Sequence, residues 1–576
     1  MYDRFPCVEA GSAEECLTGW AQIGAHLRDR IGARGKLVVE CYPGVNLAEV
    51  KRGLQQALPE ARFIDATELL RPQEEITAMV EPVLGDDPVF GRMNAIEIED
   101  FFAAAKLSEA QKQCAQGDAA LVILGTGASL VCPAPDVLVY ADMARWELQM
   151  RQRRNEIGNL GANNREDTAA QKYKRSFFVD WRSADRLKMR VFDRIDVLLD
   201  TNVPEKPRAI SGEVFRRSLR AVARRPFRVV PFFDPGPWGG HWMERVCGVP
   251  AGDAPNHAWC FDCVPEENSL LLAFGEERIE IPSIDLVLAH PQELLGQGIV
   301  ARFGAEFPIR FDFLDTVGGG NLSLQVHPLT SFICEHFGMD YTQDESYYML
   351  DAEPDACVYL GLKDGVDKQA MIRDLHRAQE EDFDFPAEQY VNRFPAKKHD
   401  HFLIPAGTVH CSGKNSMVLE ISATPYIFTF KLWDWGRVGL DGRPRPIHLA
   451  HGEANIQWNR TTEWVRKSLI NRVEPMASGE GWREERTGLH ELEFIETRRH
   501  WFTGTVPHDT NGTVHVLNLI EGDAAVVESP TNAFAPFVIH YAETFIVPAS
   551  VGQYTIRPCT PNPAKELGTI QARVRV

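Results

Sequence analysis

The sequence predicts a multidomain protein in which an α/β layer precedes a larger, all-β part. Its 576 residues suffice for three or more domains at roughly 100–200 residues each. Up to about position 225, short apolar runs alternate with stretches of helical spacing, whereas the remainder is rich in short strands separated by glycine and proline. Alternation of strands and helices favours a parallel sheet, and closely spaced short strands favour an all-β fold.

The α/β part is predicted from a succession of apolar strands. Residues 36–41 read as a buried strand, and residues 47–58 follow with helical spacing behind Asn46, a residue type that caps helix N-termini. Further strands are predicted at 119–124, 136–140 and 195–199. The chain is expected to leave this part near residues 224–229.

Composition limits the partners that are expected. The formal net charge of −20 disfavours non-specific binding to nucleic acid or to an anionic membrane. No apolar run reaches the ~18 residues of a transmembrane helix. The N-terminus is polar and acidic, and it lacks the basic start and apolar run of a signal peptide. A cytoplasmic location is therefore expected.

Four residues in three predicted strand regions form a candidate metal site. Gln325 and His327 are two residues apart, so their side chains leave the same face of a strand. Glu345 lies near the start of the next strand, and His410 follows a turn that Pro-Ala-Gly predicts. Two imidazoles, a carboxylate and an amide oxygen suit zinc or another divalent ion, one per chain, with positions left open for a substrate. A single histidine is more often structural, so the prediction depends on all four residues together.

The order of these residues resembles that of class I mannose-6-phosphate isomerases. The shared pattern is Gln-x-His-Pro at 325–328, then Glu345, then Pro-Ala-Gly-Thr-x-His at 405–410. The resemblance covers about residues 232–576 and includes Trp-Gly-Gly at 238–240 and Asp-Trp-Gly-Arg at 434–437.

This resemblance implies a double cupin that follows the α/β part. Residues 1–225 would form the α/β domain, and residues 226–470 a metal-binding cupin with a helical insertion at about 366–397. Residues 471–576 would form a second, metal-free cupin.

The resemblance also implies an intramolecular oxidoreductase that interconverts an aldose and a ketose through a cis-enediol. A divalent cation acts as Lewis acid in such a reaction, and a nearby carboxylate moves the proton. Glu420 matches the family's glutamate beside the metal and is the candidate acid/base group, with Lys431 and Arg437 as further catalytic candidates. The candidate substrate-binding residues are Ser323, Trp238, Asp312, Arg310 and His241.

Three positions depart from the family pattern. The family usually carries lysines where this chain has Asp312 and Gln343, and an arginine where it has Lys431. Because charged hydrogen bonds contribute about 1.5–3 kcal/mol each, losing two lysines and gaining a carboxylate should weaken phosphate binding. The expected substrate is mannose 6-phosphate or a related small sugar, with an unphosphorylated or differently phosphorylated sugar as the alternative.

Two other classes of function stay open at this point. A non-catalytic sugar sensor would keep the metal and the pocket without turnover, and an iron-dependent cupin oxygenase would usually carry more histidines. The sequence indicates neither the native metal nor an oligomeric state.

The α/β part resembles a P-loop kinase of the uridine kinase type whose nucleotide loop has degenerated. A working loop reads G-x-x-x-x-G-K-[ST], and its lysine and hydroxyl hold phosphates and magnesium. Residues 40–46 contain one glycine, Gly44, and no Lys, Ser or Thr. A structural or regulatory module without phosphoryl transfer is therefore expected. Basic residues downstream could bind an anion or form a solvated, salt-bridged face: Arg145, Arg151, Arg153, Arg154, Lys172, Lys174, Arg175 and Arg182.

Overall fold

The computed structural model of the chain describes residues 1–116, 119–488, 490–560 and 564–575. The chain divides into two compact units. The α/β unit consists of Cys7–Val222 and Ser269–Ala289, and the β unit consists of Met1–Pro6, Ala223–Asn268 and His290–Val576.

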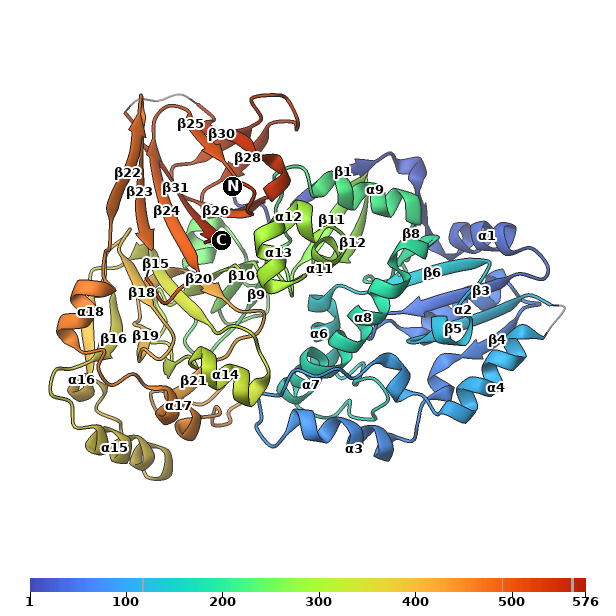
Figure 1. The fold of residues 1–576 in the computed structure, drawn as a ribbon, viewed down its shortest axis with the longest axis horizontal. Helices are drawn as coiled ribbons and strands as arrows, with labels where there is room; N and C mark the ends of the chain where they lie inside the picture. The colour runs from blue at the N-terminus through green and yellow to red at the C-terminus, as the bar shows by residue number, and fades with distance from the viewer. Residues whose placement is uncertain (117–118, 489, 561–563, 576) are drawn as a thin grey trace. The chain divides into compact units, whose positions relative to one another are not determined.

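A largely parallel sheet forms the core of the α/β unit (Figure 1). Its strand order is β2-β8-β7-β6-β3-β5-β4; the strands from β7 to β4 are parallel, and β8 and β2 run antiparallel at one edge. The strands are β2 (Cys16–Thr18), β3 (Lys36–Cys41), β4 (Arg62–Asp65), β5 (Leu121–Gly125), β6 (Val137–Asp142), β7 (Val197–Asp200) and β8 (Arg208–Ser211). The predicted parallel sheet is thus confirmed, and the four predicted strands correspond to β3, β5, β6 and β7.

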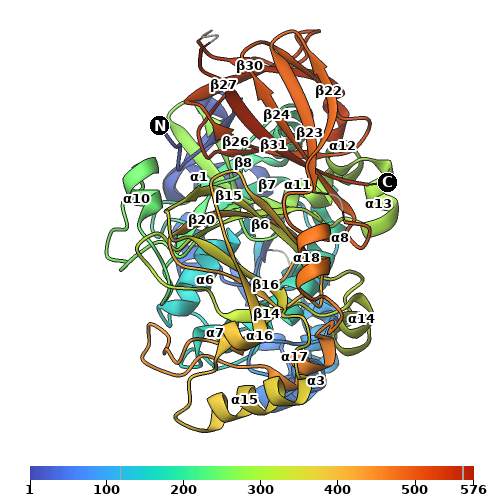
Figure 2. The ribbon, with the colours of Figure 1, turned by 90° about the vertical axis from the view of Figure 1, so that its left-hand side faces the viewer.

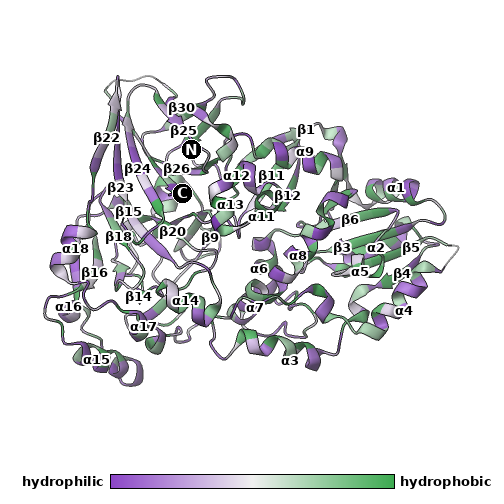
Figure 3. Ribbon diagram, in the orientation of Figure 1, coloured by the Kyte–Doolittle hydropathy of each residue, from purple (hydrophilic) through white to green (hydrophobic). Residues whose placement is uncertain are grey.

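Helices connect these strands. Helix α2 begins after Asn46, whose side chain accepts a hydrogen bond from the Glu49 backbone N–H at 3.2 Å, as the sequence predicts. Figure 3 shows hydrophobic residues along β3, β5 and β6 and hydrophilic stretches on the helices. The helices are α1 (Gly19–Ile31), α2 (Leu47–Ala57), α3 (Gln73–Leu84), α4 (Ala104–Ala115), α5 (Ala128–Val131), α6 (Arg145–Arg153), α7 (Ala169–Arg175), α8 (Arg182–Val191) and α9 (Gly212–Val222). Throughout the described part of the chain, no helix combines the length and apolarity needed to cross a membrane.

A hairpin from residues 269–289 also belongs to the α/β unit, although the sequence predicted it to lie in the metal-binding cupin. Its strands are β11 (Ser269–Phe274) and β12 (Glu277–Pro282), followed by α11 (Ile284–Ala289), and β11 pairs in parallel with β1 (Cys7–Gly11). Leu270 and Leu272 are fully buried. The apolar run of β11 predicts a strand, but it cannot indicate that the partner of this strand is β1, far away in the sequence at the N-terminus.

Two antiparallel sheets form the first sandwich of the β unit. The order in one sheet is β18-β15-β20-β13-β10-β9, and in the other it is β17-β16-β19-β14-β21. The first sheet contains β9 (Phe232–Asp234), β10 (Trp259–Cys263), β13 (Arg310–Asp315), β15 (Asp344–Ala352), β18 (His401–Ile404) and β20 (Ser416–Ala423). The second contains β14 (Leu324–Val326), β16 (Cys357–Leu362), β17 (Val391–Pro395), β19 (His410–Ser412) and β21 (Phe430–Trp433).

A second sandwich follows in the chain, and it too consists of two antiparallel sheets. The strands of one are β22 (Glu474–Gly479), β23 (Trp482–Gly488), β24 (Ile495–Phe502), β31 (Leu567–Val574), β26 (His515–Glu521) and β29 (Thr544–Val547). The strands of the other are β25 (Val506–Asp509), β30 (Gln553–Pro558), β27 (Ala524–Glu528) and β28 (Phe537–His540). Phe502, Leu517, Phe545 and Ile556 belong to the buried apolar core between the sheets.

Short helices connect the strands of the β unit. The predicted helical insertion at 366–397 contains α15 and α16 but ends in strand β17. Figures 1 and 2 both show the second sandwich at one end of the β unit and α15 at the other. The helices are α10 (Trp242–Cys247), α12 (Pro291–Leu295), α13 (Gln297–Phe303), α14 (Thr330–Phe337), α15 (Lys368–Glu380), α16 (Ala387–Tyr390), α17 (Leu449–Asn455) and α18 (Thr462–Ser468).

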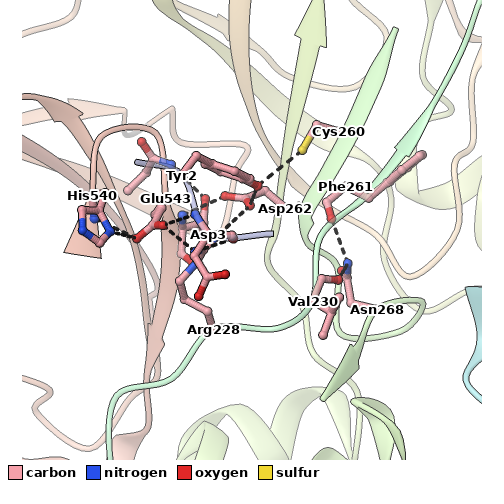
Figure 4. A network of polar contacts seen from close by, with 12 residues as sticks. Tyr2, Asp3, Arg228, Val230, Cys260, Phe261, Asp262, Asn268, His540 and Glu543 are labelled. Atoms are coloured by element: carbon pink, nitrogen blue, oxygen red, sulfur yellow. Dashed lines mark hydrogen bonds and ion pairs between the residues drawn. The ribbon is translucent and has the colours of Figure 1, made fainter. Parts of the chain in front are cut away.

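The first six residues also belong to the β unit, where Tyr2 and Asp3 join a buried polar network (Figure 4). The Tyr2 hydroxyl donates to Asp262, and the Asp3 backbone N–H donates to Glu543 Oε1 at 2.7 Å. Arg228 lies 2.8 Å from Glu543 and 3.5 Å from Asp262. One buried guanidinium therefore balances two buried carboxylates, and the N-terminal segment completes their hydrogen bonding.

Candidate metal centre

The predicted ligands converge between the two sheets of the first sandwich. Gln325 lies on β14, directly opposite His410 on β19, and His327 follows β14 by one residue. Glu345 is the second residue of β15, in the other sheet. The turn before His410 depends on Gly407, which has φ = 87° and has no space for a Cβ beside the Asn455 carbonyl.

His327, Glu345 and His410 form a buried group that could hold a metal ion, with ligand atoms within 4.8 Å of one another. Glu345 lies 2.9 Å from the Nε2 atoms of both histidines. The other ring nitrogens face backbone carbonyl oxygens, since His327 Nδ1 is 2.7 Å from Phe428 O and His410 Nδ1 is 2.8 Å from Thr408 O. A proton on each Nδ1 leaves Nε2 with its lone pair directed toward the centre of the group.

The chemistry of this group fits a divalent metal. The polar atoms of the group are buried and face one another: His327 Nε2 lies 2.9 Å from Glu345 Oε2, and His410 Nε2 lies 2.9 Å from Glu345 Oε1. Burial raises the pKa of Glu345, but His327 and His410 outweigh that effect and hold the pKa well below its usual value. An ionised carboxylate and two imidazoles suit zinc or a similar ion.

Two glutamines adjoin the group. Gln325 Nε2 lies 3.3 Å from His410 Nε2, and Gln325 Oε1 accepts a hydrogen bond from Ser323 Oγ at 3.1 Å. Gln343 Nε2 donates to Glu345 Oε2 at 2.9 Å, and its Oε1 accepts from the Phe428 backbone N–H at 3.0 Å. The sequence suggested only a lost lysine at Gln343; in the structure this residue orients the central carboxylate.

Glu420 shares the inner face of the β15-β20-β13 sheet with Glu345. It lies in register between Tyr347 on β15 and Asp312 on β13, and the next row contains Glu345, Ser422 and Arg310. Residues directly opposite on neighbouring strands have Cβ atoms about 4.5–5.5 Å apart. The structure therefore places Glu420 in the row of side chains next to Glu345.

Burial and neighbouring charges raise the pKa of two carboxyl groups on this face. Burial, then the charges of Glu345 and Asp312, raise the pKa of Glu420 well above its usual value. Burial raises the pKa of Asp312 to about 6, although Arg310 donates a hydrogen bond to it at 2.9 Å. Acid/base catalysis needs a carboxyl group that can hold a proton near neutral pH.

Lys431 and Ser323 lie close to the candidate ligands. Lys431 on β21 is in register with Gln325, and burial, then Arg445, lowers its pKa to about 8. Ser323 contacts Gln325 through the hydrogen bond given above.

Three other predicted residues have their described contacts elsewhere. Arg437 pairs with Asp434 at 2.7 Å. The buried Trp238 ring packs edge-on against Trp259, with ring centroids 4.7 Å apart. His241 lies 3.2 Å from Glu244, and its side chain is 45% exposed. These contacts do not bring Arg437, Trp238 or His241 to the metal group.

Tyr347 was not among the residues predicted from the sequence. It follows Glu345 by two residues on β15, so strand periodicity alone would have placed both side chains on the same face. It is fully buried, and its ring packs edge-on against His410 with centroids 5.8 Å apart.

Part of the chain is similar to proteins named mannose-6-phosphate isomerase. It is 28% identical to "Mannose-6-phosphate isomerase ManA" of Bacillus subtilis over 228 residues, which are 40% of this chain and 67% of that protein. It is 26% identical to "Mannose-6-phosphate isomerase" of Streptococcus mutans over 214 residues, 37% of this chain and 61% of that protein. The chain therefore spans about two thirds or less of the length of these relatives.

A solved structure and a family model also match parts of the chain. The crystal structure of mannose 6-phosphate isomerase from Bacillus subtilis aligns with 61% of this chain and 100% of its own, with a TM-score of 0.49 and 18% sequence identity. Residues 19–224 match a family described as "Domain of unknown function (DUF8485)". Over about 40% of its length, the chain is homologous to mannose-6-phosphate isomerases.

Proposed function

We propose that the β unit is a metal-dependent aldose–ketose isomerase of the mannose-6-phosphate isomerase type. The observation that carries the proposal is the buried group of His327, Glu345 and His410. Glu420 stands in the neighbouring row of the same sheet face, and the homology points to the same reaction. Gln325 completes the proposed ligand set.

The reaction moves a proton between adjacent carbons of an open-chain sugar through a cis-enediol. A bound divalent cation supplies Lewis acidity toward the substrate's oxygen atoms. Glu420 removes the proton from one carbon and returns it to the next, a role that its raised pKa supports. Lys431, whose pKa is about 8, is mostly charged near neutral pH and stabilises negative charge near Gln325.

Substitution of one ligand tests the proposal. His410→Ala should remove most of the bound zinc and reduce isomerase activity by at least a hundredfold. His376→Ala, which changes a partly exposed histidine of α15, is the matched control and should retain both. Metal content per chain and turnover of a panel of free and phosphorylated aldoses are the measurements. A His410→Ala protein with full zinc and full activity contradicts the proposal.

Mannose 6-phosphate should be a poor substrate of this site. Asp312 introduces a carboxylate, and the guanidinium of Arg310 donates a hydrogen bond to that carboxylate. The double substitution Asp312→Lys with Gln343→Lys should raise kcat/KM for mannose 6-phosphate. Turnover by the unmodified protein at rates usual for enzymes, about 1–1000 per second, would show instead that other cations hold the phosphate.

For the α/β unit we propose a degenerate kinase-like module without phosphoryl transfer. The Gly44 carbonyl accepts a hydrogen bond from Arg151 at 3.0 Å, and the Tyr42 hydroxyl donates to Asp185 at 3.0 Å. The Lys188 ammonium lies 4.7 Å from the centre of the Tyr42 ring. The loop at 40–46 is thus packed by its own unit and offers no phosphate-holding side chain.

Lack of ATP hydrolysis and of phosphoryl transfer is the expected result for this module. Activity would be measured by phosphate release and by transfer of labelled phosphate to nucleosides and sugars. Robust transfer that disappears in Gly44→Val would overturn the proposal.

A further inference from the structure

Tyr347 is a polar side chain that neither the metal group nor the acid/base role uses. Its hydroxyl is buried and makes no hydrogen bond of ordinary geometry among the described residues; the side chain that pairs with it there is the Glu345 carboxylate. That carboxylate also accepts a hydrogen bond from Gln343 and faces His327 and His410. A metal held by Glu345 would compete for the same oxygen atoms, so the Tyr347 hydroxyl stays available to a partner from outside the chain.

Asp312 provides an unpaired oxygen atom in the same row. Its Oδ2 accepts a hydrogen bond from Arg310, but its Oδ1 is buried and has no partner among the described residues. Register places Tyr347 on one side of Glu420 and Asp312 on the other. A donor, the proposed acid/base residue and an acceptor therefore stand side by side on one sheet face.

We infer that Tyr347 and Asp312 form a hydroxyl-binding subsite on either side of Glu420, and that its ligand is the uncharged, polyhydroxylated part of a sugar. The inference rests on the proposed function and names the substrate class for that site. A phenol donates a hydrogen bond at neutral pH, a carboxylate accepts one, and a sugar hydroxyl can do both.

A phosphate group does not suit these two residues. A dianion needs several donors, best supplied by Arg or Lys, and Asp312 offers an acceptor instead. On its other side, Tyr347 is in register with Phe402 of β18, which has no polar group to offer. Tyr347 and Asp312 therefore suit hydroxyl groups near the reacting carbons of the sugar. This holds whether or not the other end of the sugar carries a phosphate.

Tyr347→Phe is the test, and Tyr348→Phe is the matched control. Tyr348 is the next residue of β15 and points to the opposite face, where its hydroxyl lies 3.0 Å from His399 Nδ1 and 3.3 Å from Arg499 Nη1. With the aldose that the unmodified protein converts best, Tyr347→Phe should lower kcat/KM about 10–100-fold, and Tyr348→Phe should change it less than threefold.

Monodeoxy versions of that aldose identify the hydroxyl that Tyr347 contacts. The unmodified protein should lose activity when this hydroxyl is absent, whereas Tyr347→Phe should show no further loss with the same monodeoxy sugar. An equal loss for every sugar in the series, or an equal effect of Tyr348→Phe, overturns the assignment.

A binding measurement separates this subsite from the isomerase proposal. Calorimetric titration of the zinc-loaded protein with D-mannose, the other aldohexoses and their alditols should give weaker binding for Tyr347→Phe. If no sugar is isomerised but this difference is found, the subsite stands and the reaction fails. If sugars are isomerised and Tyr347→Phe changes nothing, the subsite fails alone. Absence of binding by every probe to the unmodified protein also overturns the subsite.

Discussion

His401 illustrates how burial determines the charge of a single side chain. It lies on β18 and is fully buried; burial, then the positive charge of Arg499, lowers its pKa to about 3. A histidine in an unfolded chain has a pKa of about 6.5. Because the folded-state pKa is the lower one, the stability that neutral His401 contributes is complete above pH 6.5. It is lost as the pH falls from 6.5 toward 3, by about 1.4 kcal/mol per pH unit.

His401→Phe should therefore weaken the acid sensitivity of the β unit. The urea midpoint of the unmodified protein should fall between pH 6.5 and pH 4, and that of His401→Phe should fall less steeply. His376→Phe in α15 serves as the control and should follow the unmodified protein. Parallel curves for all three proteins would contradict the pKa given for His401.

Single residues also show what the sequence could predict about the site. His327, Glu345 and His410 could be predicted because short-range patterns place Gln325 and His327 on one face and a turn before His410. The row of Tyr347, Glu420 and Asp312 joins three strands that are widely separated along the chain. Periodicity within one strand says nothing about how that strand aligns with its neighbours, so the sequence did not indicate Tyr347 or the hydrogen bond from Gln343 to Glu345.

At the scale of one element, the loop between β18 and β19, residues 405–409, positions His410 in the metal group. Arg460 Nη1 donates to the carbonyl oxygens of Pro405 and Ala406, each at 2.7 Å, and to Thr408 Oγ1 at 2.5 Å. The Gly407 backbone N–H donates to the His327 carbonyl at 2.9 Å. One guanidinium thus holds three acceptors of the loop that ends at a ligand.

Arg460→Met should lower zinc affinity about 10–100-fold, the usual effect of losing a group that supports a metal ligand. Arg460→Lys should recover part of the affinity because an ammonium keeps the positive charge and can still donate to these acceptors, although without the fixed geometry of the guanidinium. Competition with a chromophoric chelator measures the change. Lys467→Met, on the exposed side of α18, is the control, and an equal change in both variants would show that the loop is not involved.

The elements that could be predicted are those whose signal is local. The parallel strands β3, β5, β6 and β7 carry apolar runs that need no information from elsewhere in the chain. The short edge strands β2 and β8 pair with each other across almost the whole α/β unit, and β1 pairs with β11 across a still longer stretch of chain. The sequence could not predict these two pairings, because the register of a strand depends on its partner as well as on its own residues.

At the scale of the whole molecule, the network around Arg228 contributes strongly to the stability of the β unit. Arg228→Met would leave Asp262 and Glu543 buried without their cation, and breaking a buried ion pair in this way costs about 3–5 kcal/mol. The urea or thermal midpoint of the β unit should fall accordingly. Arg224→Met, at an exposed position in the same segment, is the control and should leave the midpoint within error of the unmodified protein.

Each of the two units contains a segment from the part of the chain that mainly forms the other unit. A cut after Val222 yields two pieces, and each piece still carries a segment that is folded into the other's unit: Met1–Pro6 in one direction, Ser269–Ala289 in the other. A protease site engineered at this position should therefore produce two bands on a denaturing gel but one peak in size-exclusion chromatography. For the same reason, residues 1–222 cannot be removed at one breakpoint without disturbing the β unit. Removing them would take Tyr2 and Asp3 from the β unit and leave β11 without β1.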